Sequence, residues 1–148
     1  MVREILNKTV NGIKLMITVP DSATREDVVE EFIYWIRYYK TAANKIKLAR
    51  NRLQEIAEED KLIEWLLYDE GYDSHLENRA KFFDEIALSL LKEFMDYVSA
   101  DELIRHAADL FNAGMTKAVK SIIKAIEEGT PRADGEVDAD GGGQDGAD

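Results

Sequence analysis

The side chains that could carry out chemistry are of few kinds. The chain has two histidines, His75 and His106, together with thirty aspartates and glutamates, and it has no cysteine. A helical bundle rich in carboxylates can hold a di-metal site, which takes a Glu-x-x-His motif from each of two helices. No such motif occurs here, although Glu102 and His106 are four residues apart and could share a helix face. We therefore predict no metal site and no cofactor.

Motifs for covalent or nucleotide chemistry are also missing. The sequence contains no Gly-x-Ser-x-Gly, no P-loop and no dinucleotide fingerprint. Adjacent acids such as Asp84-Glu85 fall in a helical pattern, where neighbouring side chains point apart. Residues 136–141 superficially resemble the start of a calcium loop, but its twelfth position would be Ala147 and no helix could follow. We predict that the chain is not an enzyme.

The most distinctive feature of the sequence is a basic and aromatic stretch, residues 34–52. It carries six basic residues and no acidic one, interleaved with four aromatic side chains. Basic residues beside aromatic rings can hold phosphates and stack bases, so the stretch is a candidate interaction surface. Its defining residues are Tyr34, Trp35, Arg37, Tyr38, Lys40, Lys47 and Arg52.

The same stretch also has a structural interpretation. Residues 55–109 carry sixteen acidic and five basic residues. Arg37, Lys40 and Lys47 would lie on one flank of the apolar stripe of their helix, and complementary flanking charges set partner and orientation in helical bundles. We favour the interpretation in which this helix pairs antiparallel with an acidic third helix and the aromatic residues belong to the core.

The first twenty residues predict a β-hairpin. Asn11-Gly12 is typical of a two-residue type I′ turn. After it, every second residue from Ile13 to Val19 is a branched apolar residue, which is the pattern of a half-buried strand. This turn places Val10 opposite Ile13 and Leu6 opposite Ile17. A lone hairpin is marginally stable in water, so its apolar face must pack on helices or on another chain.

Helical patterns follow the hairpin. Thr24 predicts the N-cap of a long helix, whose apolar residues recur in steps of three and four from Val29 to Ala57 and are interrupted by Arg50. The acidic cluster at residues 58–60 is a poor helix C-terminus, so the helix either continues or restarts there.

Capping signals predict the later helix boundaries. A serine followed three residues later by a glutamate forms a capping box, which predicts helix starts at Ser74 and Ser99. Gly114 predicts the end of the second of these helices, and Thr116 predicts the N-cap of the last helix, which stops at Gly129.

These elements predict a mainly α fold, a bundle of four or five helices with an N-terminal β-hairpin. We expect one domain at residues 1–128 and a disordered acidic, Gly/Asp-rich tail at residues 129–148. The formal net charge of −11 disfavours generic binding to nucleic acid or anionic membrane. Since we find no signal peptide and no apolar stretch that could span a bilayer, we expect a soluble cytoplasmic protein without a membrane partner.

Two resemblances bear on function. Residues 1–38 resemble the first half of a ubiquitin-like β-grasp domain, but the later strands of that fold have no counterpart here. A hairpin before acidic helices is also similar in outline to small assembly chaperones and connector proteins of tailed phages, which implies a viral or mobile-element origin.

We therefore expect a non-catalytic protein–protein interaction or assembly protein, oligomeric through its heptad helices or its hairpin edge. A nucleic-acid-associated regulator that uses residues 34–52 and an acidic nucleic-acid mimic are the alternatives.

Overall fold

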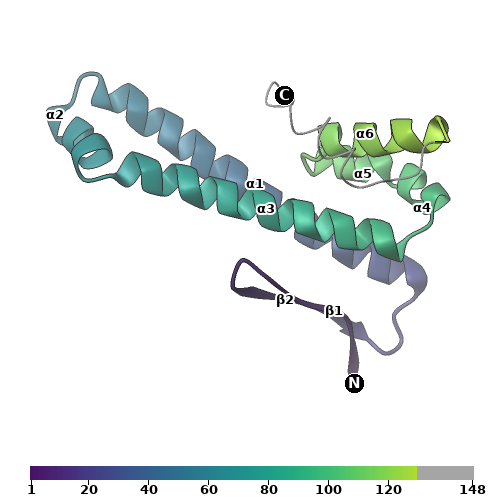
Figure 1. Cartoon of the computed structure of the whole chain (residues 1–148). Helices are drawn as coiled ribbons and strands as arrows, with labels where there is room; N and C mark the ends of the chain where they lie inside the picture. Colours follow the sequence, from purple (N-terminus) through teal and green to yellow (C-terminus); the bar gives the residue numbers. More distant parts are fainter. Residues whose placement is uncertain (130–148) are drawn as a thin grey trace. The chain divides into compact units, whose positions relative to one another are not determined.

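The computed structural model describes residues 1–129, which form a two-stranded sheet followed by helices (Figure 1). The chain divides into two compact units, Met1–Lys92 and the part from Glu93 onward, which we describe separately. The mainly α class with an N-terminal hairpin is confirmed. The tail predicted for residues 129–148 lies outside the described residues, except for Gly129.

The hairpin has the predicted turn. Strands β1 (Val2–Val10) and β2 (Ile13–Pro20) pair antiparallel. Asn11 has a φ of 51° and Gly12 a φ of 83°, so both central residues adopt the left-handed conformation that a type I′ turn requires. The two cross-strand pairs predicted from this turn are formed.

One face of the hairpin is buried against helices. Strand β2 contacts helix α1 (Arg25–Ala57), and the side-chain amide of Asn11 donates a 2.9 Å hydrogen bond to Glu85 of helix α3 (Tyr72–Tyr97). The helices thereby supply the packing that an isolated hairpin lacks. The buried hairpin residues are Leu6, Leu15, Ile17 and Val19.

Helix α1 begins at a reciprocal cap. The Thr24 hydroxyl accepts from the backbone N–H of Asp27 at 3.1 Å, and the Asp27 carboxylate accepts from the backbone N–H of Thr24 at 3.0 Å. From there the helix continues for 33 residues and buries one stripe, as its apolar spacing predicts. The buried residues of α1 are Val28, Val29, Phe32, Ile33, Ile36, Ala43 and Ala57.

The helix restarts after the acidic cluster at residues 58–60. The Asp60 carboxylate accepts from two backbone N–H groups and caps the short helix α2 (Lys61–Glu64). A π-helical turn, η1 (Trp65–Asp69), follows, and the backbone N–H of Glu70 donates to the carbonyl of Trp65 at 3.0 Å. The sequence pattern contained no signal for this wider turn.

The predicted start of α3 at Ser74 is wrong. Gly71 adopts a φ of 79°, which reverses the chain and lets the helix begin at Tyr72. The backbone N–H of His75 already donates to the carbonyl of Gly71 at 3.1 Å, so Ser74 lies inside the helix and does not cap it.

The second unit begins with the end of α3 and continues with two short helices. The capping box predicted at Ser99 is confirmed, since its hydroxyl accepts from the backbone N–H of Glu102 and the Glu102 carboxylate accepts from the backbone N–H of Ser99. At His106, where φ is −100° and ψ is 11°, the expected single helix divides into α4 (Ala100–Arg105) and α5 (Ala107–Asn112). This break and the restart at Asp60 bring the described α-helices to six.

Helix α6 (Thr116–Glu127) closes the described part of the second unit. Gly114 has a φ of 95° and Gly129 a φ of 72°, as the two predicted helix ends require. The prediction of Thr116 as an N-cap is wrong, because it is the first helical residue and its hydroxyl lies 3.5 Å from the carbonyl of Phe111. Large buried residues of the second unit are Phe94, Leu103, Leu110, Met115, Val119 and Ile122.

The two faces of helix α1 as a candidate interaction site

One side of α1 is joined to α3 by ion pairs. Lys40 Nζ lies 2.9 Å from Asp84 Oδ1, and Lys47 Nζ lies 2.7 Å from Asp84 Oδ2. The lysines are seven residues apart, which is two helical turns, so both reach the same carboxylate. Partial burial alone would raise the pKa of Asp84, but the hydrogen bonds from Lys47 and Lys40 outweigh it and the pKa lies below its ordinary value.

A second ion pair lies three turns nearer the start of α3. Arg50 Nε and Nη2 donate to the two carboxylate oxygens of Asp73 at 2.8 and 2.9 Å, and Gln54 donates to Asp73 Oδ1 at 3.0 Å. The hydrogen bond from Arg50 lowers the pKa of Asp73 more than desolvation raises it. Arg50, which interrupts the apolar stripe in the sequence, is therefore a contact between the two helices.

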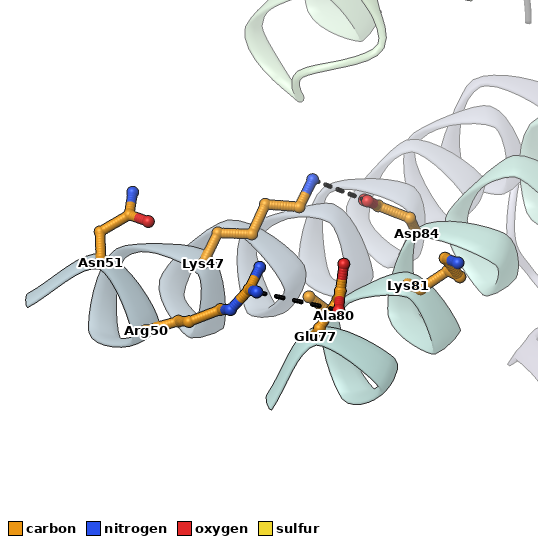
Figure 2. A pocket seen from close by; sticks show the side chains of 7 residues that line it. All are labelled: Lys47, Arg50, Asn51, Glu77, Ala80, Lys81 and Asp84. Carbon is orange, nitrogen blue, oxygen red and sulfur yellow. Dashed lines mark hydrogen bonds and ion pairs between the residues drawn. The ribbon is translucent and has the colours of Figure 1, made fainter. Parts of the chain in front are cut away.

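These ion pairs border a groove between α1 and α3 with a volume of about 400 Å³. Figure 2 shows the amine of Lys47 directed at Asp84 and the guanidinium of Arg50 directed at Glu77, whose carboxylate is 3.8 Å away. The ion pairs along the groove join cations of α1 to carboxylates of α3 and so favour one alignment of the two helices. The residues that line the groove are Lys47, Arg50, Asn51, Glu77, Ala80, Lys81 and Asp84.

The aromatic residues of the stretch form a continuous chain of ring contacts. Tyr34 and Trp35 have ring centroids 5.1 Å apart, Trp35 and Tyr38 are 5.3 Å apart, and Tyr38 and Tyr39 are 5.3 Å apart. Tyr39 then reaches Phe83 of α3 at 6.0 Å. Edge-to-face and stacked rings at these distances stabilise one another beyond the effect of their burial, so these contacts stabilise the aromatic cluster of the first unit.

The cluster runs from the core to the surface. Tyr39 is half-buried, and burial, followed by the nearby Tyr38, raises its pKa. Trp35 is also half-buried, and its indole N–H donates to Glu31 at 3.1 Å. Tyr34 and Tyr38 are each 52% exposed. The core interpretation therefore fits Tyr39, whereas Tyr34 and Tyr38 present their rings to solvent.

Helix α1 has an outward face opposite its buried stripe. Its residues recur mostly in steps of three and four, which keeps them on one side of the helix, and all of them are exposed. Arg37, Lys45 and Arg52 on this face form no ion pair with any residue that the structure describes. The outward face comprises Glu30, Tyr34, Arg37, Tyr38, Thr41, Lys45, Leu48 and Arg52.

The structure thus divides the residues of the predicted surface. Lys40 and Lys47 face α3, as the pairing interpretation predicts. Arg37, which that interpretation places on the same flank as these lysines, lies on the outward face together with Arg52, Tyr34 and Tyr38, and Trp35 is half-buried. The candidate surface is consequently smaller and less basic than the sequence indicates.

The sequence analysis did not identify Asp73 and Asp84 as the acidic partners of the basic stretch. They are eleven residues apart, which is three helical turns, and so they share one side of α3. This spacing indicates that the two acids share a helix face, but acids occur at many neighbouring positions of the same helix. The spacing by itself does not select these two.

The histidines lie apart from any cluster of metal ligands. His106 is buried at the junction of α4 and α5, with Nδ1 3.3 Å from Asp109 Oδ2. The Glu102 carboxylate accepts a hydrogen bond from the backbone N–H of Ser99. His75 stacks on Tyr72 with centroids 5.9 Å apart. Across residues 1–129, no group of three or more acidic or histidine side chains is placed to hold a metal ion.

Neutralising the inner and outer cations of α1 should have different effects on stability. We expect Lys40→Gln with Lys47→Gln to lower the free energy of unfolding by about 1 kcal/mol, because two partly exposed pairs with Asp84 are lost. The matched control, Arg37→Gln with Arg52→Gln, should stay within about 0.5 kcal/mol of the wild type. Urea denaturation measures both, and equal losses would contradict the division into two faces.

None of the helices at residues 1–129 combines the length and the apolar character needed to cross a membrane. Searches among protein family models, curated proteins and solved structures find no match to this chain.

Proposed function

We propose that the chain is a non-catalytic assembly protein that self-associates, with the outward face of α1 as its contact surface. The observation that carries the proposal is the exposure of Tyr34 and Tyr38, whose rings contact each other and Trp35 on the same helix. Aromatic side chains with little conformational freedom contribute strongly to protein interfaces, because they bury a large area at a low cost in entropy.

The ion pairs of α1 argue against the nucleic-acid alternative. Lys40, Lys47 and Arg50 are three of the six cations in the basic stretch, and each is held by a carboxylate of α3. A cation already paired within the protein gains less from a phosphate, and the net charge of −11 repels nucleic acid at longer range.

Light scattering on the intact protein tests the proposal. We expect a dimer or larger species at micromolar concentration, and a shift to monomer when Tyr34→Ser and Tyr38→Ser are combined, because the interface loses its two aromatic anchors. Leu88→Ser is the matched control, since Leu88 is an exposed apolar residue of α3, outside the outward face.

Two results would contradict the proposal. A monomeric wild type would rule out self-association as its function. Retention of a mixed-sequence oligonucleotide that weakens steeply with salt, and is lost in Arg37→Gln with Arg52→Gln, would favour the regulator instead.

A further inference from the structure

Four exposed apolar side chains lie where the chain passes from α1 to α3, at the end of these two helices that carries α2 (Figure 1). Each of the four is between 41% and 69% exposed, and none belongs to the outward face of α1. Exposed apolar side chains that gather in one place mark interaction sites more often than single ones do. We call this group the tip surface, and it consists of Leu62, Trp65, Tyr68 and Tyr72.

The segment that carries the tip surface is held by its own buried side chains. Leu67 is fully buried, Ile63 and Leu66 are half-buried, and both α2 and η1 contact α1. The exposed side chains therefore extend from a backbone that packing fixes, which lowers the entropy lost when a partner binds. The π-helical geometry of η1 is itself uncommon, and such turns frequently occur at functional sites.

The charges around the tip surface are almost all of one sign. Residues 58–71 carry six acidic residues and one basic residue, Lys61. All six acidic side chains are exposed, and none forms an ion pair with a residue in the described part of the chain. The apolar side chains thus lie within a strongly negative field. The acidic residues are Glu58, Glu59, Asp60, Glu64, Asp69 and Glu70.

This field selects among the possible occupants. A second copy would bring two acidic surfaces together, and nucleic acid and anionic membranes are repelled in the same way. Lysine and arginine side chains of a partner would be attracted by the carboxylates, and they also bind favourably over tryptophan and tyrosine rings.

We propose that the tip surface binds a basic segment of a different protein. Apolar side chains of that segment pack on Leu62 and Trp65, and its lysines or arginines meet the surrounding carboxylates. The tip surface and the outward face of α1 share no residue, so this inference does not depend on the proposed self-association. It adds a second kind of partner to the assembly function.

Tryptophan fluorescence detects occupation of the tip surface. The chain has two tryptophans, so Trp35→Phe leaves Trp65 as the single reporter. The probe is a synthetic peptide in which lysines flank a central pair of leucines. We expect it to move the Trp65 emission to shorter wavelength, because it displaces water from the ring, and Trp65→Phe should show no shift. Peptides with serine for leucine or glutamate for lysine should bind about tenfold more weakly, since each loses one kind of contact.

Neutralised acids test the charge selection in the Trp35→Phe background. Glu58→Gln with Glu59→Gln should weaken binding of the lysine peptide about fivefold, because two exposed attractions are lost. The matched control is Glu127→Gln with Glu128→Gln, which removes two adjacent exposed acids at the end of α6 and changes the net charge equally. It should leave the affinity within about twofold of its starting value.

Serine substitutions test the apolar contact in the same way. Leu62→Ser should weaken binding of the lysine peptide about tenfold, since the peptide loses an apolar anchor. Leu48→Ser is the matched control, because Leu48 is exposed to a similar extent, at 65%, but lies on the outward face of α1. Its peptide affinity should be unchanged.

Three results would overturn the proposal. The first is a Trp65 emission that the lysine peptide does not change. The second is an equal loss of affinity from the two glutamate pairs, which would mean that the peptide is attracted to an acidic protein without a defined site. The third is a shift to shorter wavelength that grows with protein concentration in the absence of peptide, which would assign the tip surface to a second copy.

Discussion

Replacing Phe32 with alanine is expected to lower the free energy of unfolding by about 3–5 kcal/mol, the range typical of a large aromatic core residue. Phe32 is 1% exposed and lies among the residues of α1 that are buried in the part of the helix nearest the hairpin. A two-stranded sheet cannot hold its own apolar face, so the loss of this packing should weaken the hairpin as well as the helix. Urea denaturation at a concentration where the protein is monomeric measures the effect.

Tyr34, two residues further along the same helix, provides the control for Phe32. Tyr34→Ala removes a ring of similar size from the outward face, where the side chain is 52% exposed. We expect a change of about 1 kcal/mol or less in the monomer, because its ring contacts are partly replaced by water. Similar losses for the two variants would mean that the buried and outward faces of α1 have been assigned incorrectly.

The local signals in the sequence predicted the elements well. The hairpin follows from Asn11-Gly12, because few dipeptides take a positive φ at both positions, and the Ser99 capping box follows from two side chains three residues apart. The predictions failed where the backbone begins or interrupts a helix at a position that the capping signals did not mark. Gly71 offered a helix start earlier than Ser74, and nothing in the pattern marked the break at His106.

The candidate site was less predictable than the fold. The spacing of Lys40 and Lys47 shows that they share a flank, but their common partner depends on the register between two helices, because Asp84 lies 44 and 37 residues from them in the sequence. The same register decides that Arg37 remains on the surface. Periodicity gives the face of one helix, and tertiary packing decides what each face meets.

The ion pair between Arg50 and Asp73 should make stability depend on pH in the acid range. The pKa of Asp73 is lower in the folded protein than in the unfolded chain, where it is about 3.9, mainly because Arg50 donates two hydrogen bonds to the ionised carboxylate. The pair therefore contributes its full stability above the unfolded-state pKa. That contribution is lost as the pH falls through the pKa of the folded state.

Asp73→Asn is expected to remove this contribution. At about pH 7 the variant should be about 1–2 kcal/mol less stable than the wild type, because Arg50 and Gln54 lose a charged acceptor whose side chain is 16% exposed. The difference should shrink as the pH is lowered below about 4, where the wild-type carboxylate also becomes neutral. Urea denaturation of both proteins across this range measures it, with Asp69→Asn as the control at an exposed acid. A gap between wild type and Asp73→Asn that stays constant down to about pH 2 would show that the ionised carboxylate does not stabilise the contact between α1 and α3.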